Sequence, residues 1–372
     1  RREIDRAGMW MKAVAEMTPP VHVAEDNAAQ FVETRYAPLG VVCAIAPWNA
    51  PISLACWKIA PALVAGNTMV LKPSPFTPLS TLKLGELFRD IFPPGVLNVI
   101  SGGDGLGPMM TSHPGFAKIS FTGSTATGKR VMESAAKDLK RLTLELGGND
   151  AAIVLPDVDV DAVAEKVFFG AFYNSAQLCV ATKRLYVHED IYDRMRDRLA
   201  ALAAAAKVGD GLEQGTTLGP IQNKPQYDRV MALLADAKAS GLELIHGAPV
   251  PDSGGYFVPV TLVDNPPEDS RVVREEAFGP ILPMLRFSDI DDVVERANAS
   301  EYGLGGAVWS ADTAKAAEIA WRLETGTVWV NQNLYLRPDT PFAGHKHSGF
   351  GAENGMEGLL EYMTPQAVYV AR

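Results

Sequence analysis

The sequence contains few cysteines, and none of them lies close to another. Its 372 residues include three, Cys43, Cys56 and Cys179. An odd number with no close pair argues against a disulfide framework and favours a reducing compartment, and no signal peptide is visible. We therefore expect a cytoplasmic protein.

The sequence also lacks an apolar run long enough to cross a bilayer, and it lacks an excess of positive charge. It has 34 Lys and Arg residues and 44 Asp and Glu residues, which gives a formal net charge of −10. Because such a charge repels phosphate backbones, we expect neither a nucleic acid nor a membrane as a partner. Hydrophobic residues make up 47% of the chain and charged residues 21%, as in ordinary globular proteins of two or three domains.

The chain does not begin with methionine. It opens within an apparent helix, residues 1–17, in which Ile4 and Met11 are among the apolar residues at helical spacing. We therefore expect that the natural N-terminal segment is missing. Residues 21–36 alternate weakly and predict a polar hairpin, and residues 367–370 predict a lone final strand.

From residue 40 onward, apolar runs alternate with helical patterns. The predicted strands of this first part are residues 41–46, 68–71, 96–100, 117–121 and 141–145, and the predicted helices are residues 53–65, 78–92, 106–111 and 124–136. A second part of the same kind follows Gly147-Gly148, our preferred domain boundary, with strands near residues 151–155, 183–188, 242–246, 281–286, 306–309 and 327–330. This alternation predicts an α/β fold with parallel sheets covered on both faces, which bind ligands at the carboxyl ends of their strands.

Cys179 lies on the short connection between a predicted helix, residues 159–173, and a predicted strand, residues 183–188. A side chain there is held but still reachable, so its thiolate could attack a carbonyl carbon. A buried cysteine with no chemical role is an equally good interpretation of this stretch alone.

Polar residues follow or end three predicted strands. Asn49 could donate its amide N–H to a carbonyl oxygen or an oxyanion, although an asparagine in a turn often satisfies its own backbone. Lys72 could bind an anion or a hydroxyl group of a nucleotide, or it could be solvated. Glu145, if it lies in an apolar pocket, would have a raised pKa and could take a proton from water, and a surface glutamate is the alternative.

Two further segments favour nucleotide binding only weakly. Around Gly123, a strand, a glycine turn and a helix start follow one another, which would let backbone N–H groups face an anion. The spacing is not the usual dinucleotide fingerprint, so an ordinary entry into a helix is the alternative. Glu276 could accept ribose hydroxyls and Phe278 could pack against a flat ring, but taken singly they form only a loop.

Together these residues resemble the aldehyde dehydrogenase superfamily. The resemblance covers nearly the whole chain, and the residues that match in order and spacing are Asn49, Lys72, Gly123-Ser124, Glu145, Cys179, Glu276, Phe278 and the run 341–349. Several weak motifs in one register are jointly specific. The resemblance implies two Rossmann-like parallel-sheet domains and a small β element for oligomerisation. It assigns residues 1–19, 38–146 and 348–361 to a nucleotide-binding domain, 147–347 to a catalytic domain, and 20–37 and 362–372 to oligomerisation strands.

The resemblance also implies a reaction. Cys179 would attack an aldehyde to give a thiohemiacetal whose oxyanion Asn49 and the Cys179 N–H hold, and hydride loss to the nicotinamide would then give a thioester. Glu145 would activate the water that hydrolyses the thioester to a carboxylic acid. Lys58 and Glu353 match positions that relay protons from this base in some members.

The implied cofactor is NAD, with NADP as a possible second, and no metal site is implied. The residues implied in cofactor binding are Ala46, Pro47, Trp48, Lys72, Ser74, Gly123, Ser124, Glu276 and Phe278. In NAD-preferring relatives a glutamate often lies three residues after the lysine that matches Lys72, and here Pro75 takes that place. Since no carboxylate would repel a 2′-phosphate, we expect mainly NAD with measurable NADP use.

The implied substrate pocket is apolar. It comprises Ala50, Leu54, Trp57, Leu178, Val180, Leu334, Leu336 and Phe342. No arginine occupies a matching position, although Arg337 is close in sequence, so we expect a medium-sized aliphatic or aromatic aldehyde rather than a dicarboxylic semialdehyde. The hairpin and the final strand suggest strand addition between subunits, hence a homodimer or homotetramer.

The sequence departs from the family pattern at two glycines, and two alternative functions stay open. Ala176 stands where the family has glycine, so a positive φ there would add strain of about 1 kcal/mol. Ala343 also stands where many members have glycine. A relative that transfers the acyl group to CoA is one alternative, which Glu145 disfavours. A catalytically silent structural or binding homologue is the other.

Overall fold

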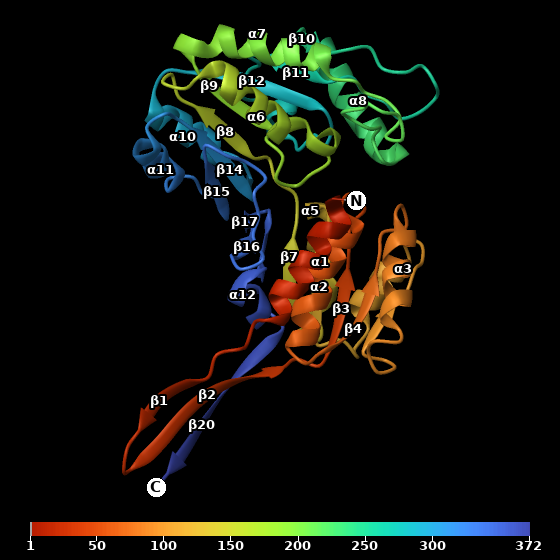
Figure 1. Ribbon diagram of the computed structural model, residues 1–372, viewed down its shortest axis with the longest axis vertical. Helices are drawn as coiled ribbons and strands as arrows, with labels where there is room; N and C mark the ends of the chain where they lie inside the picture. The colour runs from red at the N-terminus through yellow and green to blue at the C-terminus, as the bar shows by residue number, and fades with distance from the viewer. Residues whose placement is uncertain (1) are drawn as a thin grey trace. The chain divides into compact units, whose positions relative to one another are not determined.

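In the computed structural model, which describes residues 2–372, the chain folds into two compact units (Figure 1). The first unit comprises the chain up to Leu146 together with Leu336–Ala343 and Gly349–Arg372. The second unit comprises Gly147–Tyr335 and Gly344–Ser348. Among residues 2–372, no helix has the length and apolar content that a membrane span requires.

The first unit is built on a six-stranded sheet in the order β18-β7-β6-β3-β4-β5. Its parallel strands are β3 (Val41–Ile45), β4 (Thr68–Lys72), β5 (Leu97–Val99), β6 (Lys118–Thr122) and β7 (Arg141–Glu145), and β18 (Gly349–Phe350) is antiparallel to β7. The helices of this unit are α1 (Arg2–Ala15), α2 (Pro51–Val64), α3 (Pro78–Phe88), α4 (Leu106–Ser112), α5 (Thr125–Ala136) and α12 (Gly355–Leu360). The helix predicted over residues 78–92 ends earlier than expected, ahead of Pro93-Pro94.

Alternate residues of β3 enter two different cores. Val42 and Ala44 pack with the apolar side chains of α2, whereas Cys43 and Ile45 pack with those of α5. Successive side chains of a strand point to opposite faces, so both faces of this sheet are covered. The predicted α/β class with parallel sheets is confirmed.

A separate three-stranded sheet consists of β1 (His22–Asp26), β2 (Gln30–Pro38) and β20 (Met363–Ala371), in the order β1-β2-β20 (Figure 1). The predicted hairpin is confirmed by the antiparallel pairing of β1 with β2. The prediction of a lone final strand is wrong, because β20 pairs with β2 along its whole length. Its partner lies near the other end of the chain, where no local pattern could reveal the pairing.

The second unit is built on a seven-stranded sheet in the order β10-β11-β12-β9-β8-β14-β15. The strands are β8 (Ala151–Val154), β9 (Arg184–His188), β10 (Glu243–His246), β11 (Thr261–Asp264), β12 (Ile281–Phe287), β14 (Gly305–Trp309) and β15 (Thr327–Val330), and of these only β10 runs antiparallel to its neighbour. The helices are α6 (Val160–Phe172), α7 (Glu189–Ala205), α8 (Lys224–Ala239), α9 (Arg271–Arg274), α10 (Ile290–Asn298) and α11 (Thr313–Ala320). Strand β11 was not predicted, because Pro259 interrupts the apolar run that leads into it.

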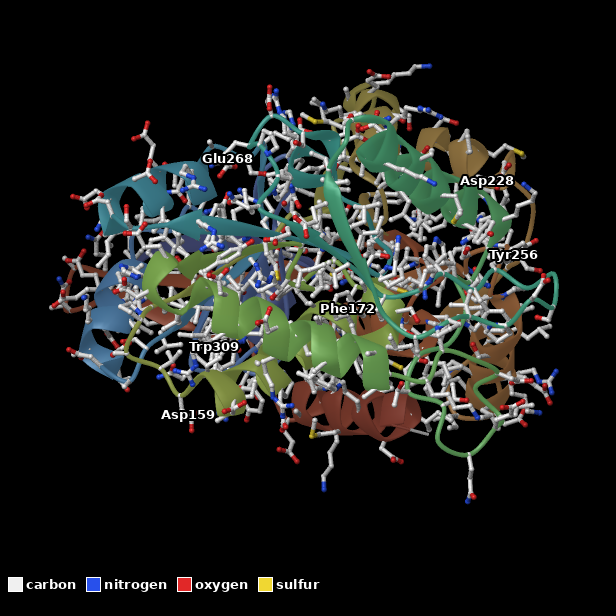
Figure 2. The ribbon with its side chains drawn as sticks, turned by 90° about the horizontal axis from the view of Figure 1, so that it is seen from above. Asp159, Phe172, Asp228, Tyr256, Glu268 and Trp309 are labelled. Carbon is white, nitrogen blue, oxygen red and sulfur yellow. The ribbon has the colours of Figure 1, made fainter. Side chains whose placement is uncertain are left out.

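Helix α6 leads directly to the segment that holds Cys179. Asp159 caps its start by accepting the N–H groups of Asp161 and Ala162 at 3.1 and 3.4 Å, and Phe172 is its last residue (Figure 2). Such a cap satisfies N–H groups that have no partner within the helix. A short turn, Tyr173–Ala176, follows at once, and its residues Asn174 and Ser175 depart from right-handed helical geometry.

Candidate active site

Cys179 is the most accessible of the three cysteines. It is half-buried on the connection between α6 and β9, whereas Cys43 and Cys56 are buried. Burial raises the pKa of the Cys43 and Cys56 thiols to about 12. Since the thiolate is the reactive form, these two are unsuited to nucleophilic chemistry, and Cys179 is the candidate nucleophile.

The segment before Cys179 has an unusual backbone. Asn174, Ser175 and Ala176 have φ angles of 55°, 54° and 60°, so three consecutive residues with side chains adopt the left-handed region. Ala176 therefore has the positive φ at which a side chain adds strain. Such a conformation costs about 1 kcal/mol or more for each residue and persists only where surrounding contacts impose it.

Hydrogen bonds to a neighbouring loop impose this conformation. Ser175 Oγ donates to the Gly219 carbonyl at 2.7 Å. Gln177 accepts the Gln222 N–H at 2.8 Å through its side-chain oxygen and donates to the Asn174 carbonyl at 3.0 Å. The loop that carries Cys179 is therefore held by its own side chains in a fixed shape.

Lys183 also holds the Cys179 segment, and sequence reasoning did not single it out. Its buried ammonium donates to the Cys179 carbonyl at 2.6 Å and lies 3.5 Å from a carboxylate oxygen of Glu276. The same Glu276 oxygen accepts the Gly148 N–H at 3.0 Å. The structure thus brings the predicted ribose-binding glutamate and the Cys179 segment together through one lysine. A lysine directly before a buried strand is the sequence signal that could have indicated it.

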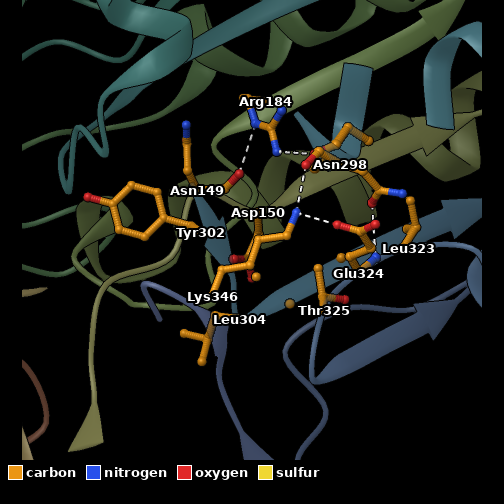
Figure 3. A pocket seen from close by; sticks show the side chains of 15 residues that line it. Asn149, Asp150, Arg184, Asn298, Tyr302, Leu304, Leu323, Glu324, Thr325 and Lys346 are labelled. Atoms are coloured by element: carbon orange, nitrogen blue, oxygen red, sulfur yellow. Dashed lines mark hydrogen bonds and ion pairs between the residues drawn. The ribbon is translucent and has the colours of Figure 1, made fainter. Parts of the chain in front are cut away.

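Asp150, Arg184 and Lys346 are among the residues that line a small pocket of the second unit (Figure 3). The Asp150 carbonyl accepts the N–H groups of Lys183 and Arg184 at 2.9 and 3.1 Å. Burial raises the pKa of the Asp150 carboxyl to about 7, against the opposing effect of Lys183. The Arg184 guanidinium donates to the Asn149 and Ala297 carbonyls at 2.9 Å each, which fixes the start of β9.

In the first unit, Glu145 ends β7 as a buried carboxyl with 4% exposure. Neither of its carboxylate oxygens has a hydrogen-bond partner among the described residues. Burial, together with the negative charge of Glu353, raises the pKa of Glu145 well above its ordinary value, and Lys58 only partly opposes this. This is the raised pKa expected if Glu145 lies in a buried pocket, and a carboxyl of this kind is suited to take a proton from water.

Lys58 and Glu353 form a buried ion pair. Their charged atoms are 2.7 Å apart, and both side chains are 1% exposed. Ser120 links them, because its hydroxyl accepts from Lys58 at 3.0 Å and donates to Glu353 at 3.2 Å. The structure therefore brings together the two residues that the resemblance suggested for proton relay, and it adds Ser120.

The predicted cofactor residues of the first unit lie at the carboxyl edge of adjacent strands. Ala46, Pro47, Trp48 and Asn49 follow β3, Lys72 and Ser74 lie at the end of β4, and Gly123 and Ser124 follow β6. Strand β3 pairs with both β4 and β6, so these turns are neighbours. This edge is where parallel α/β sheets bind nucleotides.

The chemistry of this edge fits a nucleotide. The Lys72 ammonium is buried and donates to the Pro73 carbonyl at 3.3 Å, and burial lowers its pKa while Asp104 opposes this. A buried cation at a strand end is suited to a ribose hydroxyl or a phosphate. A Cβ atom on Gly123 would lie 2.5 Å from the Phe121 ring, so a residue with a side chain would have to displace that ring. Ser124 caps α5 by accepting the Thr127 N–H at 3.3 Å.

Two of the predicted pocket residues touch each other in the first unit. The Trp57 ring lies 5.7 Å edge-on from the Phe342 ring and stacks on Trp10 at 5.6 Å. Trp10 donates to the Asn354 side chain at 2.9 Å. Sequence reasoning missed Trp10, which sits on the inward stripe of α1. Of the other predicted pocket residues, Ala50, Leu54 and Leu336 lie in the first unit and Leu178, Val180 and Leu334 in the second.

Comparison with known proteins identifies the family. The model of the aldehyde dehydrogenase family matches residues 1–368. The chain belongs to the aldehyde dehydrogenase family. An aldehyde dehydrogenase of a Fusarium species is 43% identical over 370 residues, which cover 99% of this chain and 78% of that protein.

Solved structures of the aldehyde dehydrogenase fold superpose on nearly the whole chain. Betaine aldehyde dehydrogenase from Staphylococcus aureus, in complex with NAD⁺, has a TM-score of 0.93 at 33% identity and covers 99% of this chain and 74% of its own. An NADP-dependent enzyme from Escherichia coli has a TM-score of 0.94 at 36% identity and covers 100% of this chain and 78% of its own. The fold predicted from the sequence is therefore that of solved members of the family.

Proposed function

We propose that this aldehyde dehydrogenase oxidises an aldehyde to the free carboxylic acid with reduction of NAD(P), through a thioester on Cys179. The observation that carries the proposal is Glu145, a buried carboxyl without a hydrogen-bond partner among the described residues and with a raised pKa. Such a group is suited to take a proton from water. Hydrolysis by that water distinguishes an acid-forming enzyme from one that transfers the acyl group to CoA.

Cys179 is the proposed nucleophile. Its thiolate attacks the aldehyde carbon, and the carbonyl oxygen becomes an oxyanion that the Asn49 amide and the Cys179 N–H stabilise. Lys183 supports this step, since its bond to the Cys179 carbonyl holds the peptide that follows the nucleophile. A nucleophile on a fixed loop loses little freedom when the reaction begins.

Glu145 is the proposed base of the second half-reaction. It takes a proton from water as the water oxygen bonds to the thioester carbon. The carbon–sulfur bond then breaks, the thiolate of Cys179 is regenerated, and the acid leaves. Glu145 must lose its proton before the next turnover.

The proposed cofactor-binding residues are Lys72, Ser124 and Trp48 of the first unit and Glu276 and Phe278 of the second. Lys72 and Glu276 would hold the riboses, Ser124 and Trp48 would contact the diphosphate, and Phe278 would pack against the nicotinamide. NAD(P), when bound, takes up the hydride of the aldehyde carbon, so that aldehyde and water become carboxylate and two protons are released. Relatives described with NAD⁺ and with NADP support dual use.

The proposed substrate is a medium-sized apolar aldehyde, aliphatic or aromatic. The predicted pocket residues are apolar, and Arg337, the nearest arginine in sequence, forms an ion pair with Asp339 at 2.5 Å. A guanidinium paired in this way is a poor clamp for a substrate carboxylate. The cytoplasmic location and the homodimer or homotetramer expected from the sequence remain part of this proposal.

An assay of reduced cofactor with and without CoA tests the function. The proposal predicts formation of the free acid and no dependence on CoA, and Cys179→Ala abolishes turnover while cofactor binding is retained. Cys43→Ala is the matched control, because its buried thiol is unreactive. Acyl-CoA as the product would establish the CoA-acylating alternative, and inactivity toward all aldehydes would favour a silent homologue.

A further inference from the structure

A line of buried polar groups continues beyond Lys58 and Glu353 on one face of the first-unit sheet. On β6, Ile119 and Phe121 enter the core beneath α5, so Lys118 and Ser120 point to the opposite face. On β7, Leu144 enters the same core beneath α5, so Thr143 and Glu145 share the face of Lys118. The register pairs Ser120 with Thr143. A sheet face otherwise packed with apolar side chains thus carries a polar stripe that ends at Glu145.

Lys118 is the most unusual member of the stripe, because its side chain is 0% exposed. Its ammonium donates to the Thr143 hydroxyl at 2.6 Å and lies 3.6 Å from the Glu361 carboxylate. The Thr143 hydroxyl in turn donates to Glu361 at 3.3 Å. The Glu361 side chain is 32% exposed, so this chain of contacts reaches the surface.

Tyr362 packs against the stripe. Its ring lies 4.9 Å from the Lys118 ammonium. Burial raises the pKa of its hydroxyl well above the ordinary value, and the charges of Glu353 and Glu361 both add to this. Ser120 and Lys118 lie two residues apart on the same face of β6, and the charges of Glu353 and Lys58 act on Lys118.

The pKa of the Lys118 ammonium lies close to physiological pH. Burial lowers its pKa to about 8, Lys58 acts in the same direction, and Glu361 and Glu353 oppose them. A fully buried lysine is costly, and Lys118 is not needed to neutralise Glu353, which already pairs with Lys58. An amine that can both give and accept a proton at physiological pH is suited to a relay.

We propose that Lys118, Thr143 and Glu361 extend the Lys58–Glu353 pair to solvent and form the route by which the proton taken up by Glu145 leaves the protein. The inference rests on the proposed function, since Glu145 collects one proton from water in each turnover. Glu145 is buried and has no hydrogen-bond partner among the described residues, so its proton requires a path. The proton passes to the Lys58–Glu353 pair, through Ser120 to Lys118, and from Lys118 to Glu361.

The test compares Lys118→Met, Glu361→Ala and Glu361→Gln in the whole enzyme with the unmodified enzyme. The first burst of reduced cofactor reports hydride transfer, which the route does not serve, and it stays unchanged. Steady-state turnover falls about tenfold, a fraction of what a general base contributes, and acyl-Cys179 accumulates in mass spectra of the quenched enzyme. Glu86→Gln is the matched control, since Glu86 pairs with Lys83 at the exposed surface of the same unit.

Added imidazole distinguishes a proton route from a structural role. A diffusible base that fills the space opened by Glu361→Ala restores turnover in proportion to its concentration and removes the acyl adduct. Unchanged turnover in all three variants, or a loss that imidazole does not restore at equal thermal stability, contradicts the proposal. Absence of any cofactor burst in the unmodified enzyme would instead refute the proposed dehydrogenase function.

Discussion

At the scale of single residues, burial decides which groups can react. The pKa of the Cys43 and Cys56 thiols is raised to about 12 by burial, and the pKa of the buried Glu145 carboxyl is raised well above its ordinary value. Burial disfavours the charged form of both kinds of group. It therefore makes the two thiols unreactive and makes the Glu145 carboxylate a stronger base.

Asn49→Ala tests the oxyanion role. Removal of one preorganised donor lowers kcat by about 10²–10³, the usual scale for an oxyanion hole, and changes KM little. Steady-state kinetics with saturating cofactor measure both constants. A loss confined to KM would mean that Asn49 only positions the substrate. Asn98→Ala, at an amide on β5, serves as the control.

The pH dependence of deacylation follows from Glu145. The base acts only when deprotonated, and its pKa is raised, so deacylation increases as the pH rises through a value well above that of an ordinary glutamate. Rapid-quench measurement of acyl-Cys179 decay across pH gives this curve. A rate independent of pH from acid to neutral conditions would show that another group is the base.

The sequence predicted the location of those residues that lie at the end of a predicted strand. Glu145 and Lys72 were expected at strand ends and are found there. Lys183 and Lys118 were not singled out, because their significance lies in contacts with Glu276 and Glu361, which are far away in the sequence. Local sequence patterns do not reveal contacts with residues so far away along the chain.

At the scale of elements, the turn before Cys179 stores strain. Ala176 has a φ of 60°, which glycine adopts at little cost. Ala176→Gly therefore stabilises the protein by about 1 kcal/mol, measured as a rise in the free energy of unfolding. Ala201→Gly, on the exposed side of α7, is the matched control and destabilises by about 0.5–1 kcal/mol. A loss of stability in Ala176→Gly would mean that the loop contacts compensate fully for the strain.

We predict that the turn between β4 and α3 governs cofactor choice. Pro75 is exposed in this turn and offers no charge to repel a 2′-phosphate. The unmodified enzyme uses mainly NAD with measurable NADP, and Pro75→Glu weakens NADP use by about 1–3 kcal/mol through a close like-charge contact. The ratio of kcat/KM for the two cofactors in both variants measures this. An unchanged ratio would place specificity elsewhere.

At the scale of the whole molecule, the alternation of strands and helices sufficed to predict two parallel sheets, and the structure contains both. Pairings between distant segments were beyond reach, as β20 with β2 illustrates. The strand order of each sheet was equally inaccessible, because local periodicity fixes which residues are buried but not which strands are neighbours.

The central claim is a cycle in which Cys179 forms a thioester and Glu145 hydrolyses it. Glu145→Gln tests it most directly, since glutamine is of similar size but cannot take a proton from water. Mixed with aldehyde and NAD, this variant should give a single burst of reduced cofactor and a stable acyl adduct on Cys179, with no further turnover, while Glu165→Gln on the surface of α6 turns over normally. Absence of both burst and adduct would contradict the account and assign Glu145 to activation of the thiol.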